Sequence, residues 1–200
     1  MIRDAPDASP FVPRSRNLAR LARAARACRG CPLYRQATQT VFGEGPARAA
    51  ILLVGEQPGD REDREGRPFV GPAGSELASA LDAAGLSREN VYVTNAVKHF
   101  KFEERGKRRI HKKPRVSEVV ACHPWLAAEI EAVSPKVVVA LGATAADALG
   151  RMPPPSAAVL RSLHPAAILR APDPESRRRL RANLKRDLRK AKRLAAAEKG

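Results

Sequence analysis

The stretch from residue 49 to residue 84 constrains the fold more than any other part of the chain. It opens with six residues without polar side chains, AAILLV, a pattern typical of a buried strand. A long loop rich in glycine, proline and carboxylates follows at 55–74, and Leu77 and Leu81 then recur at helical spacing before Gly85. In open α/β sheets, ligands bind where such loops leave the carboxyl ends of strands. The stretch therefore predicts an α/β fold with a binding site beside the loop.

Three further segments rich in apolar and β-branched residues, at 91–95, 136–141 and 158–163, predict the rest of the sheet. Segments with helical spacing of apolar residues separate them. We therefore expect an α/β fold, a three-layer α/β/α sandwich around a short, mostly parallel four-stranded sheet. A chain of 200 residues fits one such domain, which we place at 16–198 after a loose Pro-rich arm at 1–15.

The charge of the chain limits the classes of molecule that it is expected to bind. The net charge is +16 and the isoelectric point is near 10.8, which favours a polyanion, nucleic acid before an anionic membrane. The sequence has neither an apolar run of about eighteen residues nor an apolar signal core at its start. We therefore expect a cytoplasmic protein without a membrane partner.

The cysteines pose a separate question. Cys28 and Cys31 form a C-x-x-C pair, and Cys122 is the only other cysteine. The pair is compatible with a redox site, half a metal site or two buried thiols. A redox pair is expected after a strand, whereas this pair follows a basic helical pattern at 16–27. A metal site would need a fourth ligand other than cysteine, and zinc suits three cysteines and a histidine as well as iron does.

Several motifs resemble those of one known family. The segments GEQPG at 55–59 and GRPFVG at 66–71 closely resemble the first motif of the family 4 uracil-DNA glycosylases, and Gln57 is the version seen in the UdgX subgroup. HPAAILR at 164–170 is similar to the second motif of the family. The resemblance spans most of residues 28–170. The resemblance implies a uracil-DNA glycosylase-like fold and an activity on uracil in single- and double-stranded DNA. We expect the protein to be a monomer.

The resemblance also implies a uracil-binding set. Asn95 ends a predicted strand, and its amide offers one donor and one acceptor, which match the N3 proton and O4 of uracil. Phe69 would stack on the extruded base, and His164 would donate to uracil O2 as negative charge builds on it. Gly55 and Gln57 complete the set. The competing structural interpretation makes Asn95 and His164 turn residues.

A basic segment at 98–115 carries the remaining chemistry. From charge alone it predicts a flexible loop that attracts DNA phosphates. However, KRRIH at 107–111 resembles the loop that marks UdgX, which implies that His111 attacks C1′ of the deoxyribose after uracil leaves. Glu56 would take or orient the other ring proton, and Asp60 would polarise water or phosphate. The alkylated imidazole has no easy route to hydrolysis, so we expect capture of DNA in a single turnover.

The resemblance extends to DNA contacts at both ends of the site. Ile168 or Leu169 would be the wedge that fills the gap left by the flipped nucleotide. The full DNA-binding set is Lys107, Arg108, Arg109, Ile168, Leu169 and Arg170.

Family 4 enzymes hold a [4Fe-4S] cluster with cysteine ligands. In this sequence His99 stands where one of those cysteines is expected, and the implied ligands are Cys28, Cys31, His99 and Cys122, with His123 as the alternative histidine. Zinc is the less favoured metal. Two other functions compete with capture: a conventional multiple-turnover glycosylase, and a zinc-stapled nucleic-acid binding module without catalysis.

Overall fold

The computed structural model describes residues 7–197. In this range the chain forms a four-stranded sheet in the order β2-β1-β5-β6 and a separate two-stranded hairpin. Every ladder of the main sheet is parallel, and the hairpin is antiparallel. The strands are β1 (Ile51–Gly55), β2 (Val91–Asn95), β3 (Phe102–Arg105), β4 (Arg108–His111), β5 (Val137–Leu141) and β6 (Ala158–Ser162).

The helices connect these strands along the chain. They are α1 (Leu18–Ala25), α2 (Asp60–Glu65), α3 (Pro72–Ala84), α4 (Val116–Val133), α5 (Ala143–Gly150), α6 (Ala166–Leu169) and α7 (Pro174–Ala196). Short 3-10 helices lie at Ser9–Phe11, Pro32–Arg35 and Arg88–Asn90.

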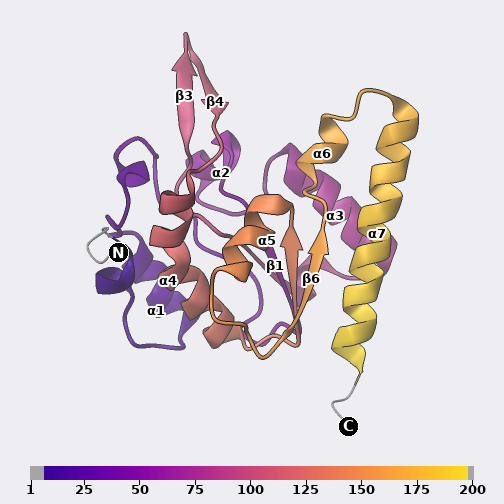
Figure 1. Ribbon diagram of the computed structural model, residues 1–200, viewed down its shortest axis with the longest axis horizontal. Coiled ribbons are helices and arrows are strands. Elements are labelled where there is room, and N and C mark those ends of the chain that lie inside the picture. Colours follow the sequence, from indigo (N-terminus) through magenta and orange to yellow (C-terminus); the bar gives the residue numbers. More distant parts are fainter. Residues whose placement is uncertain (1–6, 198–200) are drawn as a thin grey trace.

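Side chains of the central strands alternate between two cores, because successive residues of a strand point to opposite faces of the sheet. Leu52 and Val54 pack with α1, α4 and α5, whereas Ile51 and Leu53 pack with α3, α6 and α7. Figure 1 shows the sheet between these two helical layers, with the β3–β4 hairpin projecting beyond one end. The predicted three-layer sandwich is confirmed, and its sheet is entirely parallel.

The four predicted strands are confirmed. A strand that is buried on both faces is apolar along its length, which makes it easy to recognise in a sequence. All residues of β1, β2 and β5 are buried, which explains why β1 and β5 are apolar runs rather than alternating patterns; β2 is apolar until Thr94 and Asn95 at its end. β6 is an edge strand and is only partly covered, with Val159 44% exposed.

The loop at 55–74 contains a helix, α2, that the glycine and proline pattern concealed. Its sequence, DREDRE, forms ion pairs one turn apart, between Arg61 and Glu65 and between Asp60 and Arg64. α2 ends at Gly66, which adopts the left-handed conformation with φ of 73°. The next helix, α3, begins at Pro72, three residues before the start suggested by the leucine spacing.

Part of the predicted arm at 1–15 packs against the domain. Ala8 is buried, and its N–H donates to the carbonyl of Ala121 at 2.8 Å. Residues 1–6 and the predicted domain end at residue 198 lie outside the described residues. Within residues 7–197, no helix is both long enough and apolar enough to cross a bilayer.

A buried ion pair lies behind the end of β2. Lys98 and Glu129 have side chains 1% and 0% exposed, and the Lys98 ammonium donates to a Glu129 carboxylate oxygen. It also donates to Thr94 Oγ1 and to the Asn95 carbonyl, each at 2.7 Å. Glu129 accepts further hydrogen bonds from the Tyr92 hydroxyl and from Thr94, both at 3.0 Å. This network fixes the backbone from which the Asn95 side chain emerges.

Candidate active site

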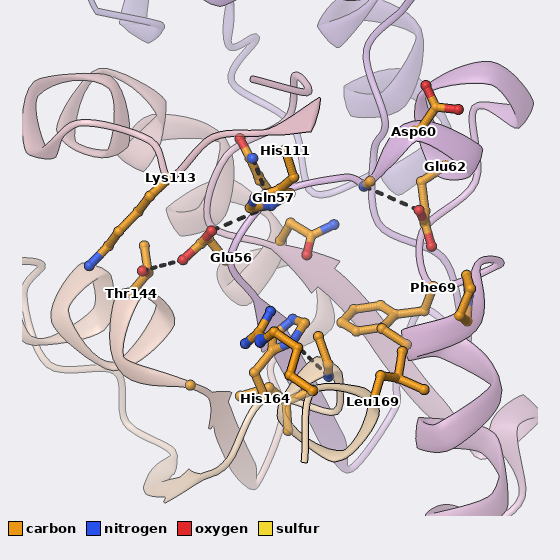
Figure 2. Close-up of a pocket in the computed structure, with 18 of the residues that line it drawn as sticks. Glu56, Gln57, Asp60, Glu62, Phe69, His111, Lys113, Thr144, His164 and Leu169 are labelled. Atoms are coloured by element: carbon orange, nitrogen blue, oxygen red, sulfur yellow. Dashed lines mark hydrogen bonds and ion pairs between the residues drawn. The ribbon is translucent and has the colours of Figure 1, made fainter. Parts of the chain in front are cut away.

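The strand order creates a crevice between β1 and β5. The connections that follow these adjacent strands run to opposite sides of the sheet, which is where open α/β sheets bind ligands. A pocket of about 800 Å³ occupies this crevice. Figure 2 shows side chains from several elements turned toward it. Those predicted from the sequence that line the pocket are Glu56, Gln57, Asp60, Phe69, Asn95, His111, His164, Leu169 and Arg170.

Close packing explains the glycine at position 55, the last residue of β1. A Cβ atom on Gly55 would lie 2.4 Å from Asn95 Oδ1 and 2.7 Å from Phe69 Cζ. Phe69 itself has φ of 56°, a left-handed conformation that is costly for a residue with a side chain. Gly74 of α3 permits it, since a Cβ there would lie 1.8 Å from the Phe69 carbonyl oxygen. The fold thus holds Phe69 and Asn95 together at one wall.

His164 presents a defined tautomer to this wall. The Ala166 N–H donates to His164 Nδ1 at 3.2 Å, so the proton of the neutral ring lies on Nε2. The pKa of His164 is lowered to about 4, chiefly by burial; Glu56 opposes this shift, and Arg170 and His111 contribute to it. Its ring lies 6.3 Å from the Phe69 ring, centroid to centroid. His164 is therefore a neutral N–H donor at neutral pH.

Gln57 determines the tautomer of His111. Its Oε1 accepts from the Lys101 N–H at 3.1 Å, and its Nε2 donates to the Lys112 carbonyl at 2.9 Å, which fixes the orientation of the amide. The amide nitrogen also lies 2.9 Å from His111 Nε2. An amide nitrogen donates and does not accept, so His111 Nε2 carries a lone pair and Nδ1 carries the proton. The unprotonated nitrogen is the one able to attack an electrophile.

Glu56 lies on the same side of the His111 ring. Its Oε1 is 3.6 Å from His111 Nε2, and its Oε2 accepts a hydrogen bond from the Thr144 hydroxyl. This differs from our expectation that the carboxylate would serve the other ring nitrogen. Burial lowers the pKa of His111; Glu56 raises it and Arg170 lowers it. The net direction favours the neutral imidazole, although half of its side-chain surface is exposed.

Arg109 does not point toward DNA as predicted but anchors the hairpin. Its guanidinium, 13% exposed, forms ion pairs with Asp60 and with Asp63 and stacks 4.9 Å from the Phe102 ring. Burial opposes the ionisation of Asp60, but the hydrogen bonds and charges of Arg64 and Arg109 outweigh burial and hold its pKa below the ordinary value. Asp60 is thus occupied by cations, which favours a role in holding the hairpin rather than in polarising water. The basic segment forms an ordered hairpin instead of a flexible loop.

The two wedge candidates differ in burial. Ile168 is 0% exposed and belongs to the core beneath α6, so the structure does not place it for insertion into DNA. Leu169 is 42% exposed at the pocket rim. Lys107 and Arg108 are exposed at the hairpin tip, and Arg170 is exposed beside Leu169. These four residues remain candidates for DNA contact.

The predicted metal ligands are all buried. Cys28, Cys31 and Cys122 lie in one core cluster, and burial raises the pKa of Cys122 to about 12, with Cys31 and Cys28 adding to the effect. Among residues 7–197, however, no group of three or more His, Cys, Asp or Glu side chains is arranged to hold a metal ion.

The hydrogen bonding of His99 suits a ligand. The Thr40 hydroxyl donates to the Ala25 carbonyl at 2.9 Å and lies 2.9 Å from His99 Nε2. The single proton of the Thr40 hydroxyl is used in the bond to Ala25, so the hydroxyl oxygen must accept from His99 Nε2. The His99 Nδ1 atom therefore keeps a lone pair. Metal-binding histidines commonly donate their other N–H in this way. Burial lowers the pKa of His99 to about 4. The pKa of the alternative histidine, His123, is lowered by burial and by Arg151 and raised by Asp147.

Sequence reasoning missed two residues that shape the pocket. Glu62 bridges the ends of its loop, accepting from the Gly71 N–H at 2.8 Å and the Gly59 N–H at 3.1 Å. Its position three residues after Gly59 was a capping signal. Thr144 holds Glu56 across the crevice, and no local pattern marks that contact.

The fold and the pocket define an α/β protein whose pocket is lined by an aromatic ring, an amide and a histidine of a basic hairpin. The chain belongs to the uracil DNA glycosylase superfamily, whose model matches residues 42–189.

Curated relatives agree with this assignment. The chain is 45% identical over 114 residues to a type-4 uracil-DNA glycosylase of Thermotoga maritima, which covers 57% of this chain and 56% of the relative. It is 41% identical over 111 residues to one of Sulfurisphaera tokodaii, covering 55% and 47%. It is 35% identical over 161 residues to one of Pyrobaculum aerophilum, covering 70% and 79%. The chain thus spans about half the length of the first two relatives.

Proposed function

We propose that this protein excises uracil from DNA and then captures the DNA covalently through His111. The observation that carries the proposal is the position of the His111 Nε2 lone pair, 3.6 Å from Glu56 in the pocket that Phe69, Asn95 and His164 also line. The family and the relatives, named type-4 uracil-DNA glycosylases, support base excision.

Base recognition would use the wall formed by Phe69 and Asn95. The Phe69 ring offers a face for stacking, and the Asn95 amide matches the N3–H and O4 of uracil but not the reversed pattern of cytosine. His164 Nε2–H would donate to O2 of the departing base. Because His164 is neutral, it stabilises the negative charge of uracil as a fixed dipole, an effect of about 3–4 kcal/mol for comparable donors.

Capture would follow cleavage in the same pocket. The C1′–N1 bond breaks, its electron pair leaves with uracil, and the sugar develops oxocarbenium character. The His111 Nε2 lone pair then gives up the hydrogen bond from the Gln57 amide and forms the C1′–N bond, while the ring keeps its Nδ1 proton and becomes an imidazolium. The Glu56 carboxylate, held beside Nε2, would stabilise first the sugar cation and then the imidazolium.

The DNA would lie across the end of the sheet from which the hairpin projects. Lys107 and Arg108 at the hairpin tip and Arg170 at the pocket rim would contact phosphates, and Leu169 would fill the gap left by the flipped base. Since the protein supplies a wedge, we expect it to act on double strands as well as on single strands. We expect it to do so as a monomer.

The proposal is tested by mixing the protein with uracil-containing single-stranded DNA and separating the products on a denaturing gel. We expect a band of protein joined to DNA that resists heat and detergent, and uracil release equal to the amount of protein. The relatives favour a competing outcome, a conventional type-4 enzyme. Free abasic DNA in excess over the protein, without such a band, would establish that competitor.

We further propose that Cys28, Cys31, Cys122 and His99 Nδ1 hold a [4Fe-4S] cluster. The chemistry of the donors supports the proposal: the three thiols are buried in one core cluster, and the His99 Nδ1 lone pair is free of the hydrogen bond to Thr40. When bound, the cluster would supply no step of the reaction; its ligands would tie the segment after α1 and the start of α4 to the core.

Metal analysis of the purified protein tests the cluster. We expect iron and sulfide in equal amounts, with a brown colour that is lost when Cys122 is replaced by serine. Zinc gives no colour, so a colourless protein that contains zinc would contradict the cluster. If that protein also left uracil in place, the non-catalytic binding module would be the correct function.

A further inference from the structure

One hydrogen bond joins the two sides of the crevice. Glu56 follows β1, Thr144 is the second residue of α5 after β5, and the Thr144 hydroxyl donates to Glu56 Oε2 across an interval of 88 residues. Figure 2 shows this contact beside the contact of Glu56 with His111. The bond lies at the topological switch of the sheet, where nothing in the local sequence of either loop requires it.

The two oxygens of the Glu56 carboxylate have different neighbours. Oε2 is bound by Thr144, whereas Oε1 lies 3.6 Å from His111 Nε2. The main chain of Glu56 is fixed separately, because its carbonyl accepts from the Val97 N–H at 3.0 Å. A glutamate side chain has freely rotating bonds, so the hydroxyl restrains which oxygen faces the histidine.

The Thr144 hydroxyl has no comparable role in its own helix. Threonine in the first turn usually bonds to a nearby backbone group. The N-cap of α5 is Gly142, which has no side chain to cap the helix, and the Thr144 hydroxyl donates to Glu56 instead. The positive end of α5 further favours the carboxylate at this place.

We propose that Thr144 is a positioning residue of the reaction, which holds Glu56 so that Oε1 faces the sugar carbon and His111. The inference rests on the proposed function and deepens it. Thr144 is not catalytic, because it acts only through Glu56. Removing its hydroxyl frees the carboxylate to rotate away from His111 and toward solvent.

The test compares Thr144→Val, which keeps the shape, with Thr144→Ser, which keeps the hydroxyl. We expect valine to slow adduct formation by about 10-fold to 100-fold, the usual effect of a lost hydrogen bond to a charged catalytic group. Serine should stay within about 3-fold of the wild type. DNA binding should not change; it is measured with DNA that carries 2′-fluoro-deoxyuridine, whose glycosidic bond resists cleavage, so that neither excision nor capture consumes the ligand.

The pH profile separates positioning from a loss of packing. Capture requires neutral His111, so its rate falls at acid pH as the ring is protonated. The charged groups that act on this ring are Glu56 and Arg170, with neutral His164 nearby. Glu56 raises the His111 pKa; when Thr144→Val releases Glu56, this pKa falls. The acid limb should therefore move to lower pH in the valine variant, and the serine variant should restore it.

Capture at the wild-type rate by Thr144→Val, or an equal loss in both variants, would overturn the inference. If the wild type releases uracil in many turnovers without an adduct, the capture proposal fails, and Thr144 is judged by the rate of uracil release in the same variants. A wild type that neither captures DNA nor releases uracil overturns both proposals.

Discussion

His111→Ala is expected to form no heat-stable adduct with uracil-containing DNA. The substitution removes the nitrogen that closes on C1′ but leaves Phe69, Asn95 and His164 in place, so cleavage of the glycosidic bond should continue. Water can occupy the vacated space and attack the sugar, which gives an abasic product that dissociates. We expect the denaturing gel to lose the shifted band completely and uracil release to exceed the amount of protein.

Ile110→Ala is the matched control for this experiment. Ile110 precedes His111 on β4 and is 36% exposed, so truncating it alters the hairpin surface without removing the imidazole. This variant should still form the adduct. A stable adduct from His111→Ala would exclude His111 as the nucleophile, and loss of the band in both variants would point to the shape of the hairpin rather than to the ring.

Lys98→Met is expected to cause the largest loss of stability. It leaves the Glu129 carboxylate charged, 0% exposed and without its cation, which typically costs about 3–5 kcal/mol. Urea titration of the wild type and the variant measures the difference in unfolding free energy. Because Lys98 also donates to the Asn95 carbonyl, discrimination between uracil and cytosine should weaken in the variant that remains folded.

Two further variants show whether the cost comes from an unpaired charge. Lys98→Met combined with Glu129→Leu removes both charges and should recover most of the loss, since apolar replacements of buried pairs are often neutral. Glu131 lies on the same helix as Glu129, α4, and forms an exposed ion pair with Arg16. Replacing it in Glu131→Ala should lower the free energy of unfolding by less than about 1 kcal/mol. If Lys98→Met costs no more than Glu131→Ala, the buried network does not stabilise the fold.

The sequence predicted those parts of the molecule in which one local pattern has one meaning. β5 is an uninterrupted apolar run, so it could only be a buried strand. Phe69, Asn95 and His164 come from distant segments, but each follows a strand or a motif, and the parallel sheet brings their loops to one edge.

The remaining features depend on contacts between distant residues. Arg109 is one of several neighbouring cations, and charge alone did not show that Asp60 and Asp63 would hold it. Ile168 and Leu169 are similar in sequence, and only the packing of α6 separates the buried side chain from the exposed one. Thr144 belonged to a segment that we expected only to pack. Each of these outcomes was decided by a partner more than 20 residues away or by a helix face.

At the base of the hairpin that carries His111, the Lys112 N–H donates to the Lys101 carbonyl, and the Gln57 side chain bonds to the backbone of both residues. Arg109 is its clamp to α2, and the two central cores do not include the hairpin strands. Because the hairpin strands lie outside both cores, we expect that the hairpin can be removed or replaced without repacking the sheet. Under the proposed function, the step from releasing the product to retaining it would require only this short hairpin beside an existing pocket.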